Sequence, residues 1–269
     1  MATKRIGEQT IKFENPPSII GTASIVGPKE GEGPLSNYFD LVLDDDTWGQ
    51  KSFEKAEAKM QEEAIKLAIA NAKLSVQDIH FLVAGDLLNQ IISSSYTARQ
   101  IGIPYFGLYG ACSTMTESLC IGSMIIDGGF ADYVVCATSS HFSSAERQFR
   151  FPLEYGAQRK FTSQWTVTGA GATVLSSTGN GPYITYITPG KIKDYGIKDA
   201  NNMGAAMAPA AFDTILQHFK DTGYTPQDYD LIITGDLGLI GRRIVLDLME
   251  KEGYDLSANF SDCGIKIFD

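Results

Sequence analysis

The cysteine at position 112 has neighbours that could support covalent chemistry. It follows an apolar run and the pair Gly110-Ala111 in FGLYGACSTMTES, residues 106–118, and the segment after it is typical of a helix start. Amide groups at a helix N-terminus stabilise negative charge, which lowers the pKa of a thiol and favours a thiolate nucleophile. The same amides bind a carboxylate without covalent chemistry. Both roles stay open beside a third, a buried structural cysteine.

A cysteine nucleophile requires a base, and the chain contains three histidines. His80 falls in a predicted strand and His218 on a predicted helix, which indicates structural roles for both. His141 lies in the segment after a predicted strand, where sites form in α/β sheets. It is therefore the candidate site histidine, and a loop histidine without a role is the alternative.

Positive charge gathers in the same segment, 139–168. It contains Arg147, Arg150, Arg159 and Lys160, although the chain as a whole carries a formal charge of -10. Arginine binds carboxylates in a bidentate manner, so two arginines beside a helix N-terminus would form a receptor for a small dianion. Surface ion pairs or a subunit contact are the alternatives.

Composition excludes several classes of protein. The acidic balance argues against a general nucleic-acid binder. We predict no transmembrane segment, since no apolar run approaches about 18 residues, and no signal peptide, since no apolar region follows the first basic residues. The cysteines form no C-x-x-C pair, so we expect an intracellular protein with reduced thiols and without a metal site. We also expect no cofactor. The cysteines predicted to be packing residues are Cys120, Cys136 and Cys263.

The elements that would position these residues follow a repeated pattern. Residues 52–73 form a predicted amphipathic helix that leads into a strand at 79–84. A second helix, with Pro209 in its first turn, leads into a strand at 230–234. The two copies share five identities in eleven positions at a constant offset of 150, which indicates an internal duplication of a β/α unit. The matched pairs are Gln77 and Gln227, Asp78 and Asp228, Gly85 and Gly235, Asp86 and Asp236, and Leu87 and Leu237.

The remaining elements are predicted from apolar runs and capping residues. Thr114 and Glu117 fit a capping box, so a helix is expected from 114 to 126. Shorter helices are expected near 94–100 and 242–252, and segments 27–50 and 139–168 are expected to be long loops. The other predicted strands are 18–26, 104–109, 131–138, 171–177, 183–190 and 264–268.

The duplicated unit, and the cysteine at a helix start after the third strand, resemble the thiolase superfamily. The resemblance implies an α/β fold of duplicated βαβαβαββ halves in a five-layer α-β-α-β-α arrangement, with strand order 3-2-1-4-5 in each half. It assigns 1–180 to the N-terminal thiolase-like half and 181–269 to an incomplete C-terminal half, truncated before its end. It also implies a homodimer through the edge of the first-half sheet, at the third strand.

A closer resemblance is to a family of sporulation proteins within this superfamily. It is carried by GTASIVGPKEGEGPLSNYFD, GACST, DGGFADYVVCATSSHFSSAERQFRFPLEYG, VTGAGATVLS and MGAAMAPAAFDTI. The resemblance implies non-catalytic binding of dipicolinic acid, or its calcium chelate, for uptake into the developing spore through sister membrane channel proteins. The protein would be cytoplasmic and peripheral to the spore inner membrane. The residues expected to line or approach the ligand pocket are Cys112, Ser139, Ser140, His141, Arg147, Arg150 and Thr168.

The sequence departs from the thiolase pattern in its last third. Thiolases take a catalytic histidine, and usually a second cysteine, from Gly-rich motifs after the third strand of the second half, and the sequence ends at Asp269 before such a motif. We therefore expect a fragment or a chain shorter than its relatives. The alternative function is a thiolase-like acyltransferase with Cys112 as acyl-accepting nucleophile. A third is a structural assembly subunit with 139–168 as its interface.

Overall fold

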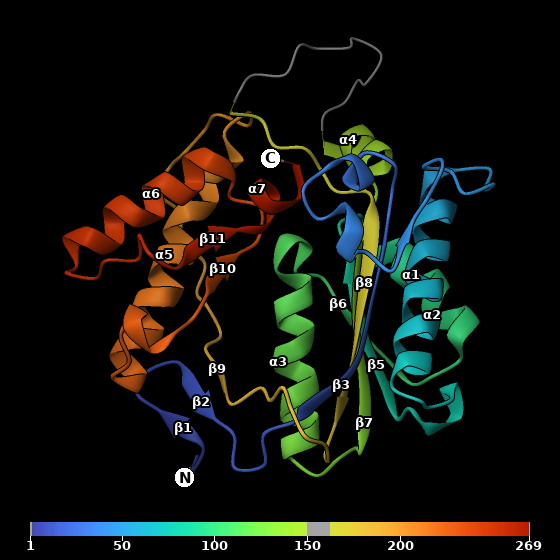
Figure 1. The fold of residues 1–269 in the computed structure, drawn as a ribbon, viewed down its shortest axis with the longest axis horizontal. Coiled ribbons are helices and arrows are strands. Elements are labelled where there is room, and N and C mark those ends of the chain that lie inside the picture. Colours follow the sequence, from blue (N-terminus) through green and yellow to red (C-terminus); the bar gives the residue numbers. More distant parts are fainter. Residues whose placement is uncertain (1, 150–161, 269) are drawn as a thin grey trace. The chain divides into compact units, whose positions relative to one another are not determined.

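The computed structural model describes residues 2–149 and 162–268 (Figure 1). The chain forms two compact units. The larger consists of Phe13–Tyr155 and Thr166–Thr185, and the smaller of Met1–Lys12, Gly156–Trp165 and Tyr186–Asp269. The candidate residues Arg150, Arg159 and Lys160 lie outside the described residues.

A six-stranded mixed sheet forms the centre of the larger unit. Its strand order is β4-β3-β8-β7-β5-β6, and β8 runs antiparallel to both of its neighbours while the other pairs are parallel. The strands are β3 (Ser18–Val26), β4 (Leu41–Val42), β5 (Phe81–Asp86), β6 (Tyr105–Leu108), β7 (Tyr133–Ser140) and β8 (Gly169–Ser176).

This order corrects the expected 3-2-1-4-5. The first predicted strand, β3, does not lie between β5 and β7, because β7 pairs directly with β5 and β3 pairs with β8. When the five strands predicted for this half are numbered along the chain from 18–26 to 171–177, the observed order is 3-2-4-5-1. An apolar run indicates a buried strand, but it does not determine which neighbouring strand will pair with that strand.

Helices cover both faces of the sheet (Figure 1). α1 (Phe53–Asn71) and α2 (Ile92–Ile101) pack on one face, where Met60, Ile65 and Leu82 belong to the main hydrophobic cluster. α3 (Thr114–Asp127) packs on the other face, where Ile126 contacts a second cluster that includes Cys136. Short 3-10 turns connect these elements, namely η1 (Glu30–Glu32), η2 (Ser36–Tyr38), η3 (Val76–Asp78), η4 (Asn89–Ile91) and η5 (Ala111–Ser113).

The smaller unit combines an antiparallel sheet, a parallel strand pair and helices. β2 lies between β1 and β9, and β10 pairs with β11 in parallel. Its core is a hydrophobic cluster that includes Leu216, Phe219, Val245 and Met249. Its elements are β1 (Arg5–Ile6), β2 (Thr10–Lys12), β9 (Tyr186–Ile187), α5 (Met203–Thr222), η7 (Pro226–Asp228), β10 (Ile232–Thr234), α6 (Gly238–Lys251), β11 (Phe260–Asp262) and α7 (Cys263–Phe268).

The residues predicted to begin or cap two helices need correction. α5 begins at Met203, so Pro209 lies inside the helix rather than in its first turn, and the Asn202 side chain caps the helix by accepting a hydrogen bond from the Ala205 amide. α3 begins at Thr114 as predicted, but no side chain caps it. The 3-10 turn Ala111–Ser113 leads directly into α3, so a Thr114–Glu117 capping box does not form.

The strand predicted at 264–268 is also wrong, because these residues belong to helix α7. The Asp262 carboxylate accepts a hydrogen bond from the Ile265 amide at 3.2 Å and so caps this helix, and the actual strand, β11, ends at Asp262. The strand predicted at 183–190 shortens to β9. Segment 139–168, expected to be a loop, contains helix α4 (Phe142–Phe149).

The internal duplication is visible in local geometry. Ser75 and Asp78 form a capping box at η3, and Thr225 and Asp228 form the same box at η7, each just before a strand. Among the described residues, no helix has the length and apolar character required to cross a bilayer.

Candidate functional site

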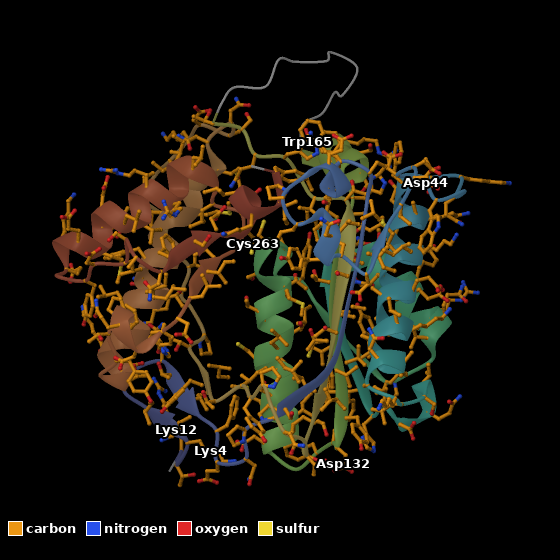
Figure 2. All side chains as sticks on the ribbon, in the orientation of Figure 1. Lys4, Lys12, Asp44, Asp132, Trp165 and Cys263 are labelled. Atoms are coloured by element: carbon orange, nitrogen blue, oxygen red, sulfur yellow. The ribbon has the colours of Figure 1, made fainter. Side chains whose placement is uncertain are left out.

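The carboxyl edge of the larger sheet gathers most of the predicted site residues. Strands β5 and β7 run in parallel register, with Asp86 opposite Ser139, and the antiparallel β8 starts at Gly169 opposite Ser140. β6 ends at this edge, and η5, which contains Cys112, follows it. Figure 2 shows Asp44 at this edge, while Asp132, just before β7, lies at the opposite end of the sheet.

Cys112 is exposed at this edge. It follows Ala111, whose φ of 49° lies in the left-handed region that residues with a β-carbon rarely adopt. Strain of this kind persists where the surrounding structure fixes it, and it is common at functional sites. The exposed position does not fit the alternative of a buried structural cysteine. A ligand contact and a nucleophile both remain compatible with it.

The other cysteines differ from Cys112 in burial. Cys136 is fully buried in β7, and its thiol donates to the Ser118 carbonyl oxygen at 3.1 Å, so it is the core residue that the sequence predicted. Burial raises the pKa of Cys120 to about 11. Burial also raises the pKa of Cys263, with a further contribution from Asp262. These thiols are therefore poor nucleophiles near neutral pH.

His141 is completely buried, and both of its ring nitrogens have partners. Nδ1 accepts a hydrogen bond from the Ser143 amide at 3.1 Å, so Nε2 carries the proton and donates to the Asp46 carbonyl oxygen at 2.8 Å. Burial lowers the pKa of the imidazole, consistent with this neutral form. His141 therefore ties the end of β7 to the loop that contains Asp46, and ligand contact by it stays a prediction.

The predicted hydroxyl residues make internal hydrogen bonds. Ser139 donates to Glu57 Oε1 at 3.0 Å, and Ser140 donates to the Val167 carbonyl oxygen at 2.6 Å. The Thr168 hydroxyl accepts from the Phe142 amide at 3.0 Å. These residues shape the edge of the sheet, and their contact with a ligand is untested.

Arg147, on α4, forms an ion pair with Glu54 on α1. Its side chain is 51% exposed, so the guanidinium remains accessible from solvent. An exposed ion pair contributes little stability, so an anionic ligand could compete for this arginine.

Sequence reasoning missed two buried carboxyl groups at this edge. Glu57 is 0% exposed, and burial together with the charge of Asp86 raises its pKa to about 8. Glu30 accepts a hydrogen bond from the Thr168 amide through Oε1, and its Oε2 is buried without a hydrogen-bond partner. Burial raises the pKa of Glu30 as well. The burial of Glu57 could have been predicted from its spacing, because it lies on the same helical face as Phe53, Met60 and Ala64.

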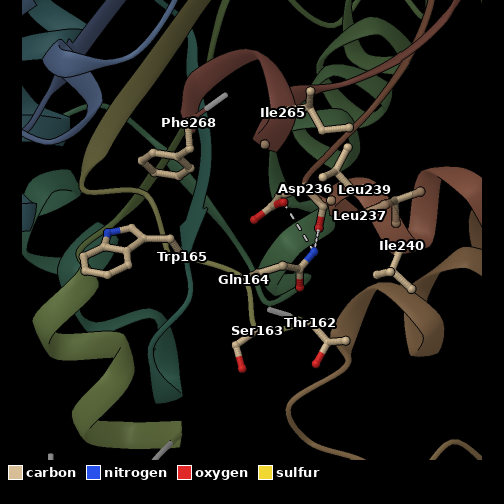
Figure 3. Close-up of a pocket in the computed structure, with 12 residues that line it drawn as sticks. Thr162, Ser163, Gln164, Trp165, Asp236, Leu237, Leu239, Ile240, Ile265 and Phe268 are labelled. Carbon is tan, nitrogen blue, oxygen red and sulfur yellow. Dashed lines mark hydrogen bonds between the residues drawn. The ribbon is translucent and has the colours of Figure 1, made fainter. Parts of the chain in front are cut away.

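The smaller unit contains a pocket of about 330 Å³ at the carboxyl end of β10 (Figure 3). The rings of Trp165 and Phe268 line it, and aliphatic side chains complete the apolar wall, namely Leu239, Ile240 and Ile265. Gln164 donates a hydrogen bond to the main-chain oxygen of Asp236, and its Nε2 lies 3.3 Å from Asp236 Oδ1.

One carboxyl group, that of Asp236, lines this pocket, and the Asp262 carboxyl lies buried nearby. Burial and the charge of Asp262 raise the pKa of Asp236 to about 6. Asp262 is itself buried and accepts hydrogen bonds from the Leu237 and Gly238 amides at 2.8 and 3.2 Å. The pocket therefore suits a ligand with an aromatic or apolar body and a cationic or hydrogen-bond-donating group. In the part of the chain that the structure describes, no three His, Cys, Asp or Glu side chains form a cluster that could hold a metal ion.

Comparisons with known proteins agree on one family. The family model for stage V sporulation protein AD (SpoVAD) matches residues 7–269. Stage V sporulation protein AD of Bacillus subtilis (strain 168) is 47% identical over 265 residues, which cover 98% of this chain and 78% of that protein.

Solved structures with a similar fold are thiolase-like enzymes. The 3-oxoacyl-(acyl carrier protein) synthase III of Xanthomonas oryzae has a TM-score of 0.63 at 15% identity, over 94% of this chain and 86% of that one. OleA of Xanthomonas campestris has a TM-score of 0.62 at 14% identity, over the same shares of the two chains. At these identities the likeness establishes the fold alone, and the fold is thiolase-like as the sequence predicted.

Proposed function

The chain belongs to the stage V sporulation protein AD family, so it is a sporulation protein, and we propose that it binds dipicolinic acid or its calcium chelate without catalysis. The ligand would pass into the developing spore through sister membrane channel proteins, with this protein acting at the inner membrane as a peripheral subunit. Family membership is the observation that carries this proposal.

The carboxyl edge of the larger sheet supports an anionic ligand. Cys112 is exposed where α3 begins, and the amides of a helix start attract carboxylates. Arg147 is half exposed, and its present partner, Glu54, is a carboxylate that a ligand carboxylate could replace. Arg150 lies outside the described residues, and we propose it as a second cation of this receptor from the sequence alone.

The pocket of the smaller unit supports an aromatic ligand, and it favours the chelate over the free dianion. The rings of Trp165 and Phe268 offer stacking surfaces for a planar ring. Asp236, which lines the pocket, would repel a free dianion when ionised, whereas the calcium ion of a chelate would attract this carboxylate.

Isothermal titration calorimetry with dipicolinate, in the presence and absence of calcium, tests this proposal. We expect Arg147→Ala and Arg150→Ala each to weaken binding by about tenfold or more, because a charge-assisted hydrogen bond contributes about 1.5 to 3 kcal/mol. Arg243→Ala is the matched control, since Arg243 also pairs with a carboxylate, Asp247, at 2.9 Å on the surface.

The calorimetric outcomes separate the two parts of the proposal. Unchanged affinity for dipicolinate in both arginine variants would contradict the proposed anion receptor at α4. A loss of affinity in Asp236→Asn that appears only with calcium would assign the chelate to the pocket. Absence of heat with either form of the ligand, in a folded protein, would overturn the proposed function.

The second candidate function is acyl transfer at Cys112. The exposed thiol after a strained alanine favours it. The histidines do not supply an obvious base: His141 has both ring nitrogens bonded, His218 bonds Thr188 and Tyr229, and His80 precedes β5 at the opposite edge of the sheet. Mass spectrometry after incubation with acyl-coenzyme A separates an acyl acceptor from a binder.

A further inference from the structure

Gln148 has a side-chain amide donor that the described part of the chain leaves without an acceptor. It lies in the last turn of α4, one residue after Arg147. Its Oε1 accepts a hydrogen bond from the Asn89 main-chain amide at 3.1 Å. Its Nε2 is buried and has no hydrogen-bond partner within the described residues. A buried donor without an acceptor costs free energy, so this group requires an explanation.

The orientation of this side-chain amide follows from its bond to Asn89. The Asn89 main-chain nitrogen is a donor, so the atom that faces it must be the acceptor, Oε1. Turning the side-chain amide over would place Nε2 against the Asn89 N–H group, donor against donor. Exchanging the two ends of the amide therefore does not remove the unpaired donor.

Asn89 is itself held in place by its surroundings. Its Oδ1 accepts a hydrogen bond from the Tyr109 hydroxyl at 2.6 Å. The next two residues, Gln90 and Ile91, have φ angles of 61° and 46°, in the left-handed region that a β-branched residue rarely adopts. Strain of this kind persists where the surrounding structure fixes it. The Asn89 main-chain amide is therefore preset to hold Gln148.

Asn89 also connects two parts of the proposed anion receptor. It bonds Gln148, the neighbour of Arg147 on α4, and it bonds Tyr109, which lies three residues before the exposed Cys112. Gln148 thus lies next to Arg147 along the helix and is joined through Asn89 to the segment that contains the thiol.

Carboxyl groups on the elements around α4 have other partners. Glu54 on α1 pairs with Arg147. Glu57, further along α1, accepts from two serine hydroxyls, and Asp86 at the end of β5 accepts from two main-chain amides. Over residues 2–149 and 162–268, no acceptor bonds Gln148 Nε2. The acceptor must therefore come from outside the described residues.

The donors at the end of α4 suit an anion. Gln148 Nε2 and the Arg147 guanidinium donate hydrogen bonds and accept none. The Arg147 side chain is 51% exposed, and its ion pair with Glu54 is open to competition from another carboxylate. A cation would find no ligand atom in these two groups, whereas a carboxylate offers oxygens to both.

We propose that Gln148 is a specificity-determining residue of the anion receptor, whose Nε2 donates a hydrogen bond to a carboxylate oxygen of the ligand that Arg147 attracts. This inference rests on the proposed function, which supplies the ligand. Arg147 attracts negative charge from any direction, whereas the Gln148 donor is neutral and fixed in direction. Gln148 therefore selects for an oxygen acceptor at one position rather than for negative charge alone.

Gln148→Glu tests this, because it keeps an oxygen for the Asn89 amide and replaces the donor by a second acceptor. Isothermal titration calorimetry of the full chain with dipicolinate should show an affinity loss of more than tenfold, since the ligand carboxylate would meet another carboxylate. Gln148→Met removes the donor without adding charge and should weaken binding by about tenfold.

Gln100→Glu is the matched control, because it introduces the same charge at an exposed position of α2 in the same unit. It should bind dipicolinate as the wild type does. An equal loss of affinity in Gln100→Glu and Gln148→Glu would contradict a specific role of Gln148, since net charge alone would then explain both.

Nitrogen-15 NMR of the side-chain amides separates failure of this inference from failure of the proposed function. The Gln148 signal, identified by its absence in Gln148→Met, should shift on addition of dipicolinate and also of acetate, a simple carboxylate probe. A wild type that binds no dipicolinate, but whose Gln148 signal shifts with acetate, would refute the proposed function and leave the carboxylate site standing. A Gln148 signal that neither compound moves, or unchanged affinity in both Gln148 variants, would overturn the inference and assign the donor to a buried water.

Discussion

At the scale of single residues, exposure separates cysteines that the sequence could not rank. Cys112 and Cys136 both border apolar runs, yet Cys112 is exposed beside a strained residue and Cys136 is fully buried. A thiol can react only where the attacking reagent reaches it. Chemistry or ligand contact at a cysteine of the larger unit is therefore expected at Cys112.

Iodoacetamide labelling of the native protein should modify Cys112 first. Cys136 should react only after denaturation, because its thiol is completely buried. Peptide mass spectrometry locates the label, and Cys112→Ser should remove the fast phase. We expect no mass shift on Cys112 after incubation with acyl-coenzyme A. An acyl adduct on that residue would contradict non-catalytic binding and support acyl transfer.

At the scale of elements, one carboxylate fastens the N-terminal hairpin β1–β2 to α5 within the smaller unit. Asp221 accepts hydrogen bonds from three successive amides, those of Glu8, Gln9 and Thr10, at 2.8, 2.8 and 2.9 Å. Burial alone would raise its pKa, but these donors outweigh burial and hold the pKa of Asp221 well below its ordinary value. An ionised Asp221 thus stabilises the docked hairpin.

Replacement of Asp221 by Asn should destabilise the protein by about 1 to 2 kcal/mol at pH 7, since hydrogen bonds to a charged group are lost at a partly exposed site. The folded pKa is depressed, so this stabilisation is present above the unfolded pKa of about 3.9 and is lost as pH falls below it. Urea denaturation at pH 7 and pH 3 measures the difference. Asp247→Asn, on the surface of α6, is the control, and an equal effect of Asp221→Asn at both pH values would contradict this account.

At the scale of the whole molecule, the free edge of the larger sheet is the expected dimer contact. β6 is its terminal strand, and apolar side chains on and beside it are exposed: Phe106 by 48%, Tyr109 by 63% and Tyr96 by 53%. Unpaired strand edges with exposed apolar side chains favour association with another chain. The homodimer through this edge remains a prediction.

Phe106→Lys should shift the protein from dimer to monomer in sedimentation equilibrium, because a buried lysine at the contact would lose its hydration. Phe130→Lys is the control, since Phe130 is 76% exposed beyond the end of α3 and is not part of β6. A wild-type protein that sediments as a monomer, or a Phe106→Lys variant that remains dimeric, would refute an interface at this edge.

Local signals in the sequence determined much of the framework. The three-and-four spacing of apolar residues predicted helix α1, and the identities at an offset of 150 included Asp78 and Asp228, which the structure shows in two matching capping boxes. Cys112 was correctly placed just before a helix. Each helix start and capping box depends on residues within about one or two helical turns of each other, so a local pattern contains the necessary information.

Tertiary structure alone decided the strand order, the burial of Glu57 and the engagement of both nitrogens of His141. Each depends on partners far along the chain: β3 pairs with β8, Glu57 meets Ser139 and Ser144, and His141 meets Asp46. A sequence pattern indicates that a strand or an apolar helical face exists, but strand pairing and burial are set by which distant surfaces pack together. The sequence therefore named candidate site residues but not Glu57 or Glu30, whereas the burial and hydrogen-bond partners of these residues were fixed only by the fold.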